Sequence, residues 1–241
     1  MRLVDYVRLT PSRKSEIPAR VSAETGLYRL RKTRKMVAFQ SSIERGFVRL
    51  CDFANEVQHI AWEPFSIEFT DLVDNRTRTY TPDYLVEIND REGQRYRYVV
   101  EVKERREAGR LVEAGGASVR GRAHIAMMHW CREQGDCSFL LATDDTIAAK
   151  GLANAKAISD RATYTPDGDL ADLILSGGLG DFPATLGSTI YHGDRFGFAR
   201  GEIISTVLHL CAWDKLWFDI TDEWSDDTVL DRGPRRRVFV R

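Results

Sequence analysis

Cysteine is scarce in this sequence, and long hydrophobic runs are missing from it. The four cysteines form no Cys-x-x-Cys pair, so neither a zinc knuckle nor a disulfide framework is predicted. Buried free thiols are the favoured interpretation, and they fit a reducing cytoplasm. No apolar run is long enough to cross a bilayer, and the N-terminal residues do not resemble a signal peptide. We therefore expect a cytoplasmic protein with no membrane partner.

The chain also lacks a sizeable net charge, but its charges are unevenly distributed. The formal net charge is −1, yet residues 1–50 hold 12 Lys and Arg against 4 Asp and Glu, whereas residues 134–231 hold 6 against 17. A second small basic cluster lies at 232–237. The basic N-terminal part could neutralise the phosphates of a nucleic acid, and ordinary solvated surface charge is the alternative.

Two other kinds of site find no support in the sequence. His124 and His129 are five residues apart, so they do not form the i, i+4 metal-binding pair of a helix, and we interpret them as helix surface or core. Gly115 and Gly116 are not followed by the lysine of a phosphate-binding loop.

Hydrophobic periodicity predicts a mixed α/β arrangement. A helix is expected from Ser41, because apolar residues recur at helical spacing from Ile43 to Ala54. Alternation predicts a strand over 59–69 that is interrupted at Pro64. The pattern continues with strands at 84–88 and 96–103, a mobile loop over 104–121, a helix that stops at Gly135, and a strand at 137–143.

The two ends of the chain are predicted to be organised differently from this middle part. The first forty residues are basic and poorly periodic, which is typical of an arm, with one short strand at 36–39. Weakly patterned residues over 148–162 form the candidate linker. Helices at 169–175 and 200–213, followed by strands at 215–220 and 227–230, then indicate a small winged-helix-like α+β domain over 163–241.

The pentapeptide Thr-Tyr-Thr-Pro-Asp occurs twice, and its first copy is followed by a Glu-x-Lys motif in the next predicted strand but one. Asp83 ends this copy at the start of a predicted strand, and the next strand carries Glu101 and Lys103. Side chains two residues apart on a strand share a face, so two neighbouring strands can bring the three groups together. Two carboxylates suit Mg²⁺, and a lysine beside them can stabilise a metal-bound hydroxide or the charge on a scissile phosphate.

A solvent-facing strand is the alternative for this charged pair. Val99, Val100 and Val102 indicate a mostly buried strand, where unpaired charges are costly, so we prefer the catalytic interpretation. The second copy ends at Asp167 and has no Glu-x-Lys after it. We interpret it as a turn, with Asp169 as the N-cap of the following helix.

Together these motifs resemble the TnsA-type endonucleases of heteromeric transposases, which belong to the restriction-endonuclease-like PD-(D/E)xK nucleases. The resemblance covers most of the chain and lies in the segments 31–36, 41–47, 64–65, 80–84 and 100–103. It implies a restriction-endonuclease-like mixed sheet flanked by helices within 1–147, basic arm included, and a winged-helix-like C-terminal domain. It also implies an active site of Glu44, Asp83 and Lys103 with Mg²⁺, as one or two ions, for which Mn²⁺ can substitute.

The sequence departs from this family at two positions. Some members lack an acid two residues before the lysine, whereas Glu101 gives this chain the orthodox nuclease arrangement and adds a carboxylate for the metal. Glu63 stands where a glutamine often precedes Pro-Phe. Glu44 also fits a capping box with Ser41, in which it only binds the backbone at the helix start, so its role stays open.

The resemblance further implies a bacterial DNA endonuclease that cuts the 5′, non-transferred strands at transposon ends. A TnsB-type transposase would cut and join the 3′ ends, and a TnsC-type ATPase would be the regulator. Contacts to backbone phosphates are expected from Arg31, Lys32, Arg34, Lys35, Arg105 and Arg106. The acidic C-terminal domain is expected to dock one of those proteins, because its charge opposes DNA. The alternatives are a stand-alone restriction or repair nuclease and a non-catalytic scaffold of a transposition complex.

Overall fold

The computed structural model describes residues 4–11, 24–89 and 92–233, and these fall into two compact units. The first unit takes in the described residues up to 52 together with those of 56–147, and the second takes in 53–55 and the described residues from 148 onward. Parts of the predicted basic arm, at 1–3 and 12–23, lie outside the described residues, as do the arginines of the C-terminal cluster at 235–237.

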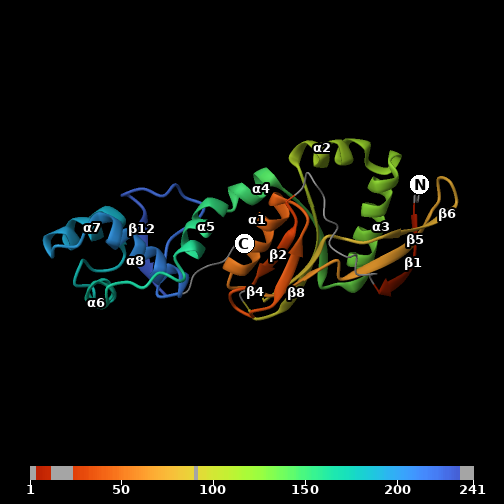
Figure 1. The fold of residues 1–241 in the computed structure, drawn as a ribbon. Helices are drawn as coiled ribbons and strands as arrows, with labels where there is room; N and C mark the ends of the chain where they lie inside the picture. Colours follow the sequence, from red (N-terminus) through yellow and green to blue (C-terminus); the bar gives the residue numbers. More distant parts are fainter. Residues whose placement is uncertain (1–3, 12–23, 90–91, 234–241) are drawn as a thin grey trace. The chain divides into compact units, whose positions relative to one another are not determined.

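The first unit contains both strands and helices, with five consecutive strands between α1 and α2 (Figure 1). Its elements are β1 (Val4–Pro11), β2 (Gly26–Arg29), β3 (Met36–Phe39), α1 (Ser42–Phe53), β4 (Val57–Trp62), β5 (Phe65–Asp71), β6 (Arg76–Tyr80), β7 (Tyr84–Asn89), β8 (Arg95–Lys103), α2 (Arg105–Ala114), the short 3-10 helix η1 (Gly115–Ala117), α3 (Val119–Gln134), β9 (Cys137–Thr143) and α4 (Asp144–Ala149).

A four-stranded sheet in the order β4-β7-β8-β9 is the main sheet of this unit. Its first three strands are antiparallel neighbours, whereas β9 runs parallel to β8. The register of β7 against β8 pairs Tyr84 with Val100 and Leu85 with Val99. A separate sheet has the order β1-β5-β6, and β2 pairs with β3. The predicted mixed α/β sheet with flanking helices is confirmed.

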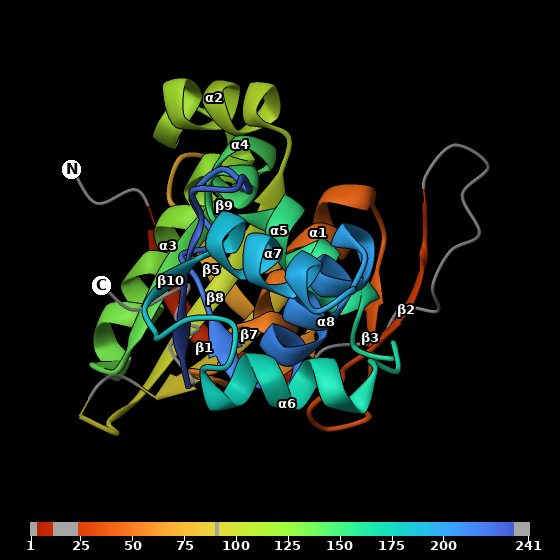
Figure 2. The same ribbon diagram turned by 90° about the vertical axis from the view of Figure 1, so that its left-hand side faces the viewer.

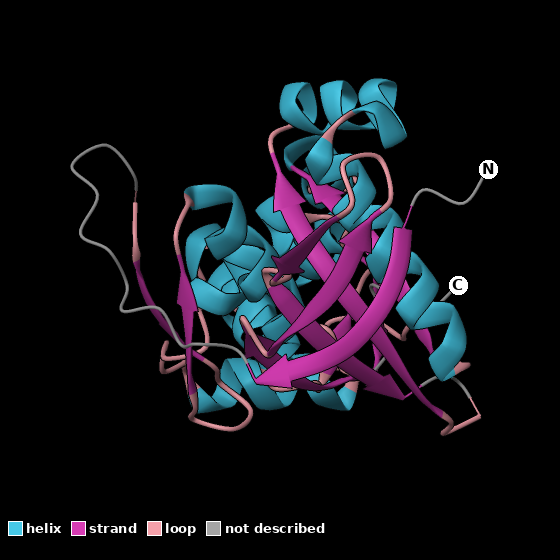
Figure 3. Ribbon diagram, turned by 90° about the vertical axis from the view of Figure 1, so that its right-hand side faces the viewer, coloured by secondary structure: helices cyan, strands magenta, loops and turns pink. Residues whose placement is uncertain are grey.

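Helices α1 and α3 pack on opposite faces of the four-stranded sheet (Figures 2 and 3). Tyr84 is buried against Phe47 of α1, with ring centroids 5.5 Å apart. The next residue, Leu85, packs instead against a cluster that contains Val99 and, from α3, Met127. Successive side chains of a strand alternate between faces, so residues on the Tyr84 face contact α1 and residues on the Leu85 face contact α3.

The predicted strand over 59–69 forms two strands, because the chain bends between β4 and β5. Glu63 has a positive φ of 41°, which is unusual for a residue with a side chain, and Pro64 removes a ladder donor. The amide of Glu63 donates a hydrogen bond to the carbonyl of Asp83 at 2.9 Å. The bend therefore passes the chain from one sheet to the other and also holds the residue that precedes β7.

Residues 105–114 form helix α2, where the glycine-rich sequence predicts a mobile loop. Apart from Gly109 and Val112, the residues of this helix favour helices, and Ala108 is buried, so one side of the helix is anchored. The chain leaves the helix at Gly115, whose φ is 45°. The loop prediction is wrong over these residues, and an ordered helix begins two residues after Lys103.

The N-terminal residues contain more strand than the single one predicted. β1 pairs antiparallel with β5, and Val4 is buried in the core cluster. β2 joins β3, the predicted strand, in a two-stranded ribbon. The arm prediction is thus wrong over 4–11 and 26–29, because pairing with residues distant in sequence supplies the order that the local pattern lacks.

The second unit consists of helices and a small sheet. Its elements are α5 (Leu152–Asp160), α6 (Gly168–Ser176), β10 (Ala184–Thr185), α7 (Leu186–Arg195), α8 (Arg200–Ala212), β11 (Leu216–Trp217) and β12 (Val229–Arg232). Helix α8 contacts α5, α6 and α7 and buries Ile203 and Val207. β12 pairs antiparallel with both β10 and β11. Within the described residues no helix combines the length and apolar character needed to span a bilayer.

Three features of this unit differ from the sequence-based expectations. Residues 148–162, the candidate linker, contain the helix α5, with Ala155 and Ile158 buried. Helix α7 was not anticipated, because its sequence mixes glycines and polar residues with the apolar ones. Asp167, rather than Asp169, is the N-cap of α6, since its carboxylate accepts the amides of Asp169 and Leu170 at 2.9 and 3.1 Å.

Candidate active site

The end of β8 presents Glu101 and Lys103 on one face of the main sheet. They share the face of Val99, which is the face that α3 covers, because side chains two residues apart point the same way. The Lys103 ammonium lies 3.0 Å from Oε1 of Glu101 and donates to the carbonyl of Val102 at 2.9 Å. The side chain of Glu101 is only 2% exposed, so this carboxylate is held inside the protein.

Asp83 completes the group from the neighbouring strand. Since Tyr84 pairs with Val100, the residue before Tyr84 comes to lie beside Glu101. Oδ2 of Asp83 accepts the amide of Val102 at 2.7 Å and the ammonium of Lys103 at 3.3 Å. The structure thus brings together the three residues that the sequence places on adjacent strands.

The two carboxylates affect each other's protonation. Burial, and next the negative charge of Glu101, raise the pKa of Asp83 to about 7, although Lys103 and the Val102 amide act in the opposite direction. Burial acts to raise the pKa of Glu101 as well, but Lys103 and the hydrogen bond from Tyr80 outweigh it, so this pKa is lowered. Asp83 is therefore the group whose charge is poorly compensated.

Three residues that the sequence analysis did not place in the site surround Glu101. The Tyr80 hydroxyl donates to Oε2 at 2.7 Å, and Arg120 Nη2 donates to Oε1 at 2.9 Å. His124 Nε2 lies 4.0 Å from Oε1 and has no hydrogen-bond partner in the described part of the chain. Burial lowers the pKa of His124, so its ring is neutral at neutral pH. Tyr80 could have been found as part of the repeated pentapeptide, whereas Arg120 lies in the segment predicted as a loop.

Glu44 is positioned from the other face of the sheet. Its amide donates to Oγ of Ser41 at 3.1 Å, and its carboxylate accepts the Gln40 amide at 2.8 Å. These two hydrogen bonds cap α1. The hydroxyl of Tyr84, a residue on the α1 face, lies 3.1 Å from Oε2 of Glu44. The charge of Glu44 is nevertheless close enough to contribute to the raised pKa of Asp83.

The donor set fits a hard divalent cation in part. Among the described residues, no group of three or more His, Cys, Asp or Glu side chains is arranged to hold a metal ion, so Glu44 does not join Asp83 and Glu101 in one such group. Two carboxylates nevertheless suit Mg²⁺, which keeps several waters and binds few protein oxygens. Oδ1 of Asp83 accepts no hydrogen bond within the described residues, and this side chain is 25% exposed, so it can receive a ligand.

The basic residues of the β2–β3 turn differ in how they are held. The Arg31 amide donates to Asp52 at 2.8 Å, and Lys32 reaches the carbonyl of Val57 at 3.4 Å, so both have structural contacts. Arg34 and Lys35 are exposed where the turn ends before β3. The latter two are better placed to meet an external phosphate.

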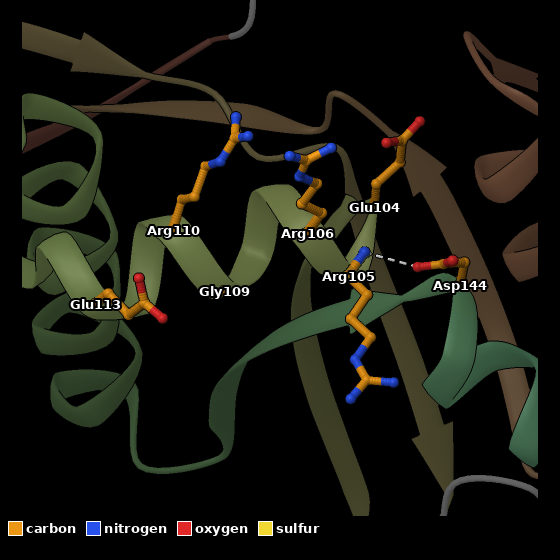
Figure 4. Close-up of a pocket in the computed structure, with 7 residues that line it drawn as sticks. All are labelled: Glu104, Arg105, Arg106, Gly109, Arg110, Glu113 and Asp144. Atoms are coloured by element: carbon orange, nitrogen blue, oxygen red, sulfur yellow. Dashed lines mark hydrogen bonds between the residues drawn. The ribbon is translucent and has the colours of Figure 1, made fainter.

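A shallow surface pocket lies along α2, directly after β8 (Figure 4). Its lining residues are Glu104, Arg105, Arg106, Gly109, Arg110, Glu113 and Asp144. The side chains of Arg106 and Arg110 point to the same side of the helix, whereas that of Arg105 points to the opposite side and lies 3.5 Å from Asp145. Arg110 was not assigned from the sequence, although its i, i+4 spacing from Arg106 is the signal that could have found it.

Residues 54–144 match the family described as TnsA-like endonuclease N terminal. The matched segment contains Asp83, Glu101 and Lys103 and begins after Glu44. The resemblance to TnsA-type endonucleases is confirmed over this segment, which is similar to the N-terminal domain of such transposition-associated endonucleases. None of the curated proteins matches the chain significantly.

Proposed function

Because residues 54–144 carry a TnsA-like endonuclease domain, we propose that the chain is the Mg²⁺-dependent DNA endonuclease of a transposition machinery. It cleaves the 5′, non-transferred strands at transposon ends, and a TnsB-type transposase processes the 3′ ends. One observation carries this proposal: Asp83, Glu101 and Lys103 converge at the end of β8, with Lys103 within 3.3 Å of both carboxylates.

Asp83 and Glu101 are the residues that would hold the ion, as one Mg²⁺ or a pair, with Mn²⁺ as a substitute. A bound divalent cation supplies charge neutralisation at the phosphate and lowers the pKa of water. Oδ1 of Asp83 is the oxygen with room for it, while Oδ2 stays tied to the Val102 amide at 2.7 Å. That amide fixes the carboxylate before any ligand arrives, which lowers the reorganisation needed for catalysis.

Lys103 stabilises negative charge at the reacting phosphate. Burial would lower its pKa, but Asp83 and Glu101 outweigh burial and raise it, so the ammonium stays charged at neutral pH. A charged lysine cannot act as the base that deprotonates water, but it can stabilise an attacking hydroxide or the charge that builds on the phosphate oxygens. Glu44 completes the site from α1 by holding Tyr84 and adding a negative charge near Asp83.

DNA is held through its backbone. Arg106 and Arg110 project together from α2, and Arg34 and Lys35 project from the β2–β3 turn. Arginine recognises phosphate with two parallel hydrogen bonds, and such contacts position a duplex without reading its sequence. Recognition of the transposon end is therefore delegated to the partner transposase.

The second unit docks a protein partner. Its three-stranded sheet and the helices α7 and α8 support a winged-helix-like arrangement, in which β12 with its neighbours forms the wing. The acidic excess over residues 134–231, with 17 Asp and Glu against 6 Lys and Arg, opposes DNA as the main ligand. A TnsC-type ATPase or a TnsB-type transposase that offers a basic surface is the partner that this charge favours.

The test combines a transposon-end duplex with the two partner proteins and maps each cut strand. Wild type should cut the 5′ strands in Mg²⁺ or Mn²⁺ and stop after chelation, and Asp83→Ala should remove these cuts. Asp167→Ala is the matched control, because it changes the same pentapeptide in its second copy, where the residue only caps α6. End cleavage by Asp83→Ala at the wild-type level would instead indicate a scaffold. Sequence-specific double-strand cleavage by the protein alone would indicate a stand-alone nuclease.

A further inference from the structure

Arg120 links the buried carboxylate of the site to solvent. It is the second residue of α3, and its Nη2 donates to Oε1 of Glu101 at 2.9 Å. Its Nη1 lies 3.2 Å from the exposed carboxylate of Glu107 on α2. The Arg120 side chain is 47% exposed, so one end of its guanidinium touches a site residue while the rest reaches water.

Glu101 has no oxygen without a donor. Oε2 accepts the hydroxyl of Tyr80 at 2.7 Å, and Oε1 meets both Arg120 at 2.9 Å and Lys103 at 3.0 Å. A cation that binds Glu101 must therefore displace one donor or crowd it. Tyr80 is buried and the Lys103 side chain is 12% exposed, whereas Arg120 is half-exposed and long, so Arg120 is the donor that can leave.

We propose that Arg120 is a phosphate-binding catalytic residue that is stored on Glu101 until the metal ion arrives. With no ion bound, Arg120 neutralises Glu101. If Asp83 and Glu101 held a divalent cation, the guanidinium would leave Glu101 and pair with a non-bridging oxygen of the scissile phosphate. This inference rests on the proposed nuclease function and adds to it a residue outside the Asp83, Glu101 and Lys103 group. The exchange only moves ion pairs, and no covalent bond changes in it.

The chemistry of the side chain suits both positions. A guanidinium is always charged and presents a planar fork of donors that matches a carboxylate and a phosphate equally well. In the stored state the guanidinium offsets the negative charge of Glu101, one of the two neighbouring carboxylates, before a cation binds. In the released state the same charge lies where negative charge grows during phosphodiester cleavage, and a fixed donor there contributes to the rate.

A purely structural role is the competing explanation, because Arg120 also ties α3 to Glu107 of α2. The two roles differ in what they predict for metal binding. A structural clamp, once removed, loosens the site and weakens the binding of a cation. A stored cation, once removed, leaves two carboxylates with Lys103 alone, so the site attracts a divalent ion more strongly.

The experiment measures Mn²⁺ binding to the DNA-free full chain and, separately, single-turnover cleavage of transposon-end DNA with the partner proteins at saturating Mn²⁺. Arg120→Met keeps the length of the side chain and removes its charge. We expect it to bind Mn²⁺ several-fold more tightly than wild type while the cleavage rate falls about 100-fold. Arg132→Met, an exposed position on the same helix, is the control and should match wild type in both assays.

Arg120→Lys keeps a charge near Glu101 and loses the two-pronged fork. It should bind Mn²⁺ as wild type does and still cleave slowly, which tests the phosphate contact even if Arg120→Met is unstable. Mn²⁺ binding by Arg120→Met that is equal to or weaker than wild type overturns the storage role, and undiminished cleavage overturns the phosphate role. If wild type itself binds no Mn²⁺, the nuclease proposal fails first, so the two failures are distinguishable.

Discussion

The hydroxyl of Tyr84 lies 3.1 Å from the carboxylate of Glu44, which ties the first turn of α1 to the strand that Asp83 precedes. Tyr84 also donates to the carbonyl of Ala38 at 2.9 Å, just before α1 begins. The residue proposed to complete the site is thus held by the backbone, by Ser41 and by a buried tyrosine. The sequence leaves open whether Glu44 caps the helix or serves the active site, and a substitution can test the two roles separately.

Glu44→Gln should leave the fold nearly intact and abolish cleavage. Glutamine keeps an oxygen for the Gln40 amide, so the cap persists, but the negative charge near Asp83 is lost. Thermal unfolding and strand-specific cleavage should be compared with those of Glu44→Ala, which loses the cap as well and should cost about 1 kcal/mol of stability. Normal cleavage by Glu44→Gln would leave only the capping role.

Tyr80→Phe should destabilise the first unit and slow cleavage. The lost hydroxyl leaves Oε2 of the buried Glu101 without its donor, which costs about 1–3 kcal/mol. Urea unfolding measures the change in stability, and cleavage at saturating metal measures the catalytic part. The control is Tyr96→Phe, whose hydroxyl bonds Ser138 in a partly buried position and not a site carboxylate. A Tyr80→Phe variant as stable as wild type would show that this hydrogen bond contributes nothing.

Arg106→Ala and Arg110→Ala should each weaken DNA binding without changing sequence preference. Each lost phosphate contact should make the slope of log affinity against log salt shallower by about 1. Arg105→Ala, which removes a side chain paired with Asp145 on the other side of α2, should have a smaller effect. Equal salt slopes for all three variants and wild type would exclude α2 from the DNA interface.

Asp71 should make the first unit sensitive to acid. The hydrogen bond from Arg122, then the Val73 amide and Arg78, hold the pKa of Asp71 below its ordinary value despite burial. A lowered folded-state pKa stabilises the fold at pH values above the unfolded-state pKa of about 4, and this contribution is lost as the pH falls further.

Asp71→Asn should therefore flatten the acid side of the stability curve and leave Arg122 without its buried partner, at a cost of about 3 kcal/mol. Arg78→Met, which removes the more exposed partner of Asp71, should destabilise the unit less than Asp71→Asn does. An unchanged pH profile for Asp71→Asn would mean that other carboxylates control acid unfolding.

The core of the site could be predicted because its information is local. Side chains two residues apart on β8 share a face, which places Glu101 and Lys103 together. Pro82 in the pentapeptide indicates that the next strand begins directly after Asp83. No long-range knowledge is needed beyond the pairing of two strands that follow each other in the chain. For the same reason α1 and the bend at Pro64 were predicted close to where they occur.

The surroundings of the site could not be predicted, because they depend on contacts between distant segments. Arg120 reaches Glu101 only after α3 packs across the sheet, and the i, i+4 pair on α2 has meaning only once that segment is known to be helical. β1 gains its order from β5, more than fifty residues away in sequence. In the second unit, α7 and α5 both pack against α8, and the buried positions of α7 include Thr189 and Gly193, which an apolar pattern does not mark.

The backbone of Glu63 has a mechanical consequence. Glu63, with its uncommon positive φ, connects the main sheet to the second sheet, and its amide donates to the carbonyl of Asp83. The junction between the two sheets therefore also holds the backbone of Asp83, the first carboxylate of the site. A shift of one sheet against the other would therefore move Asp83 relative to Glu101, so the spacing of the two carboxylates depends on how both sheets are packed.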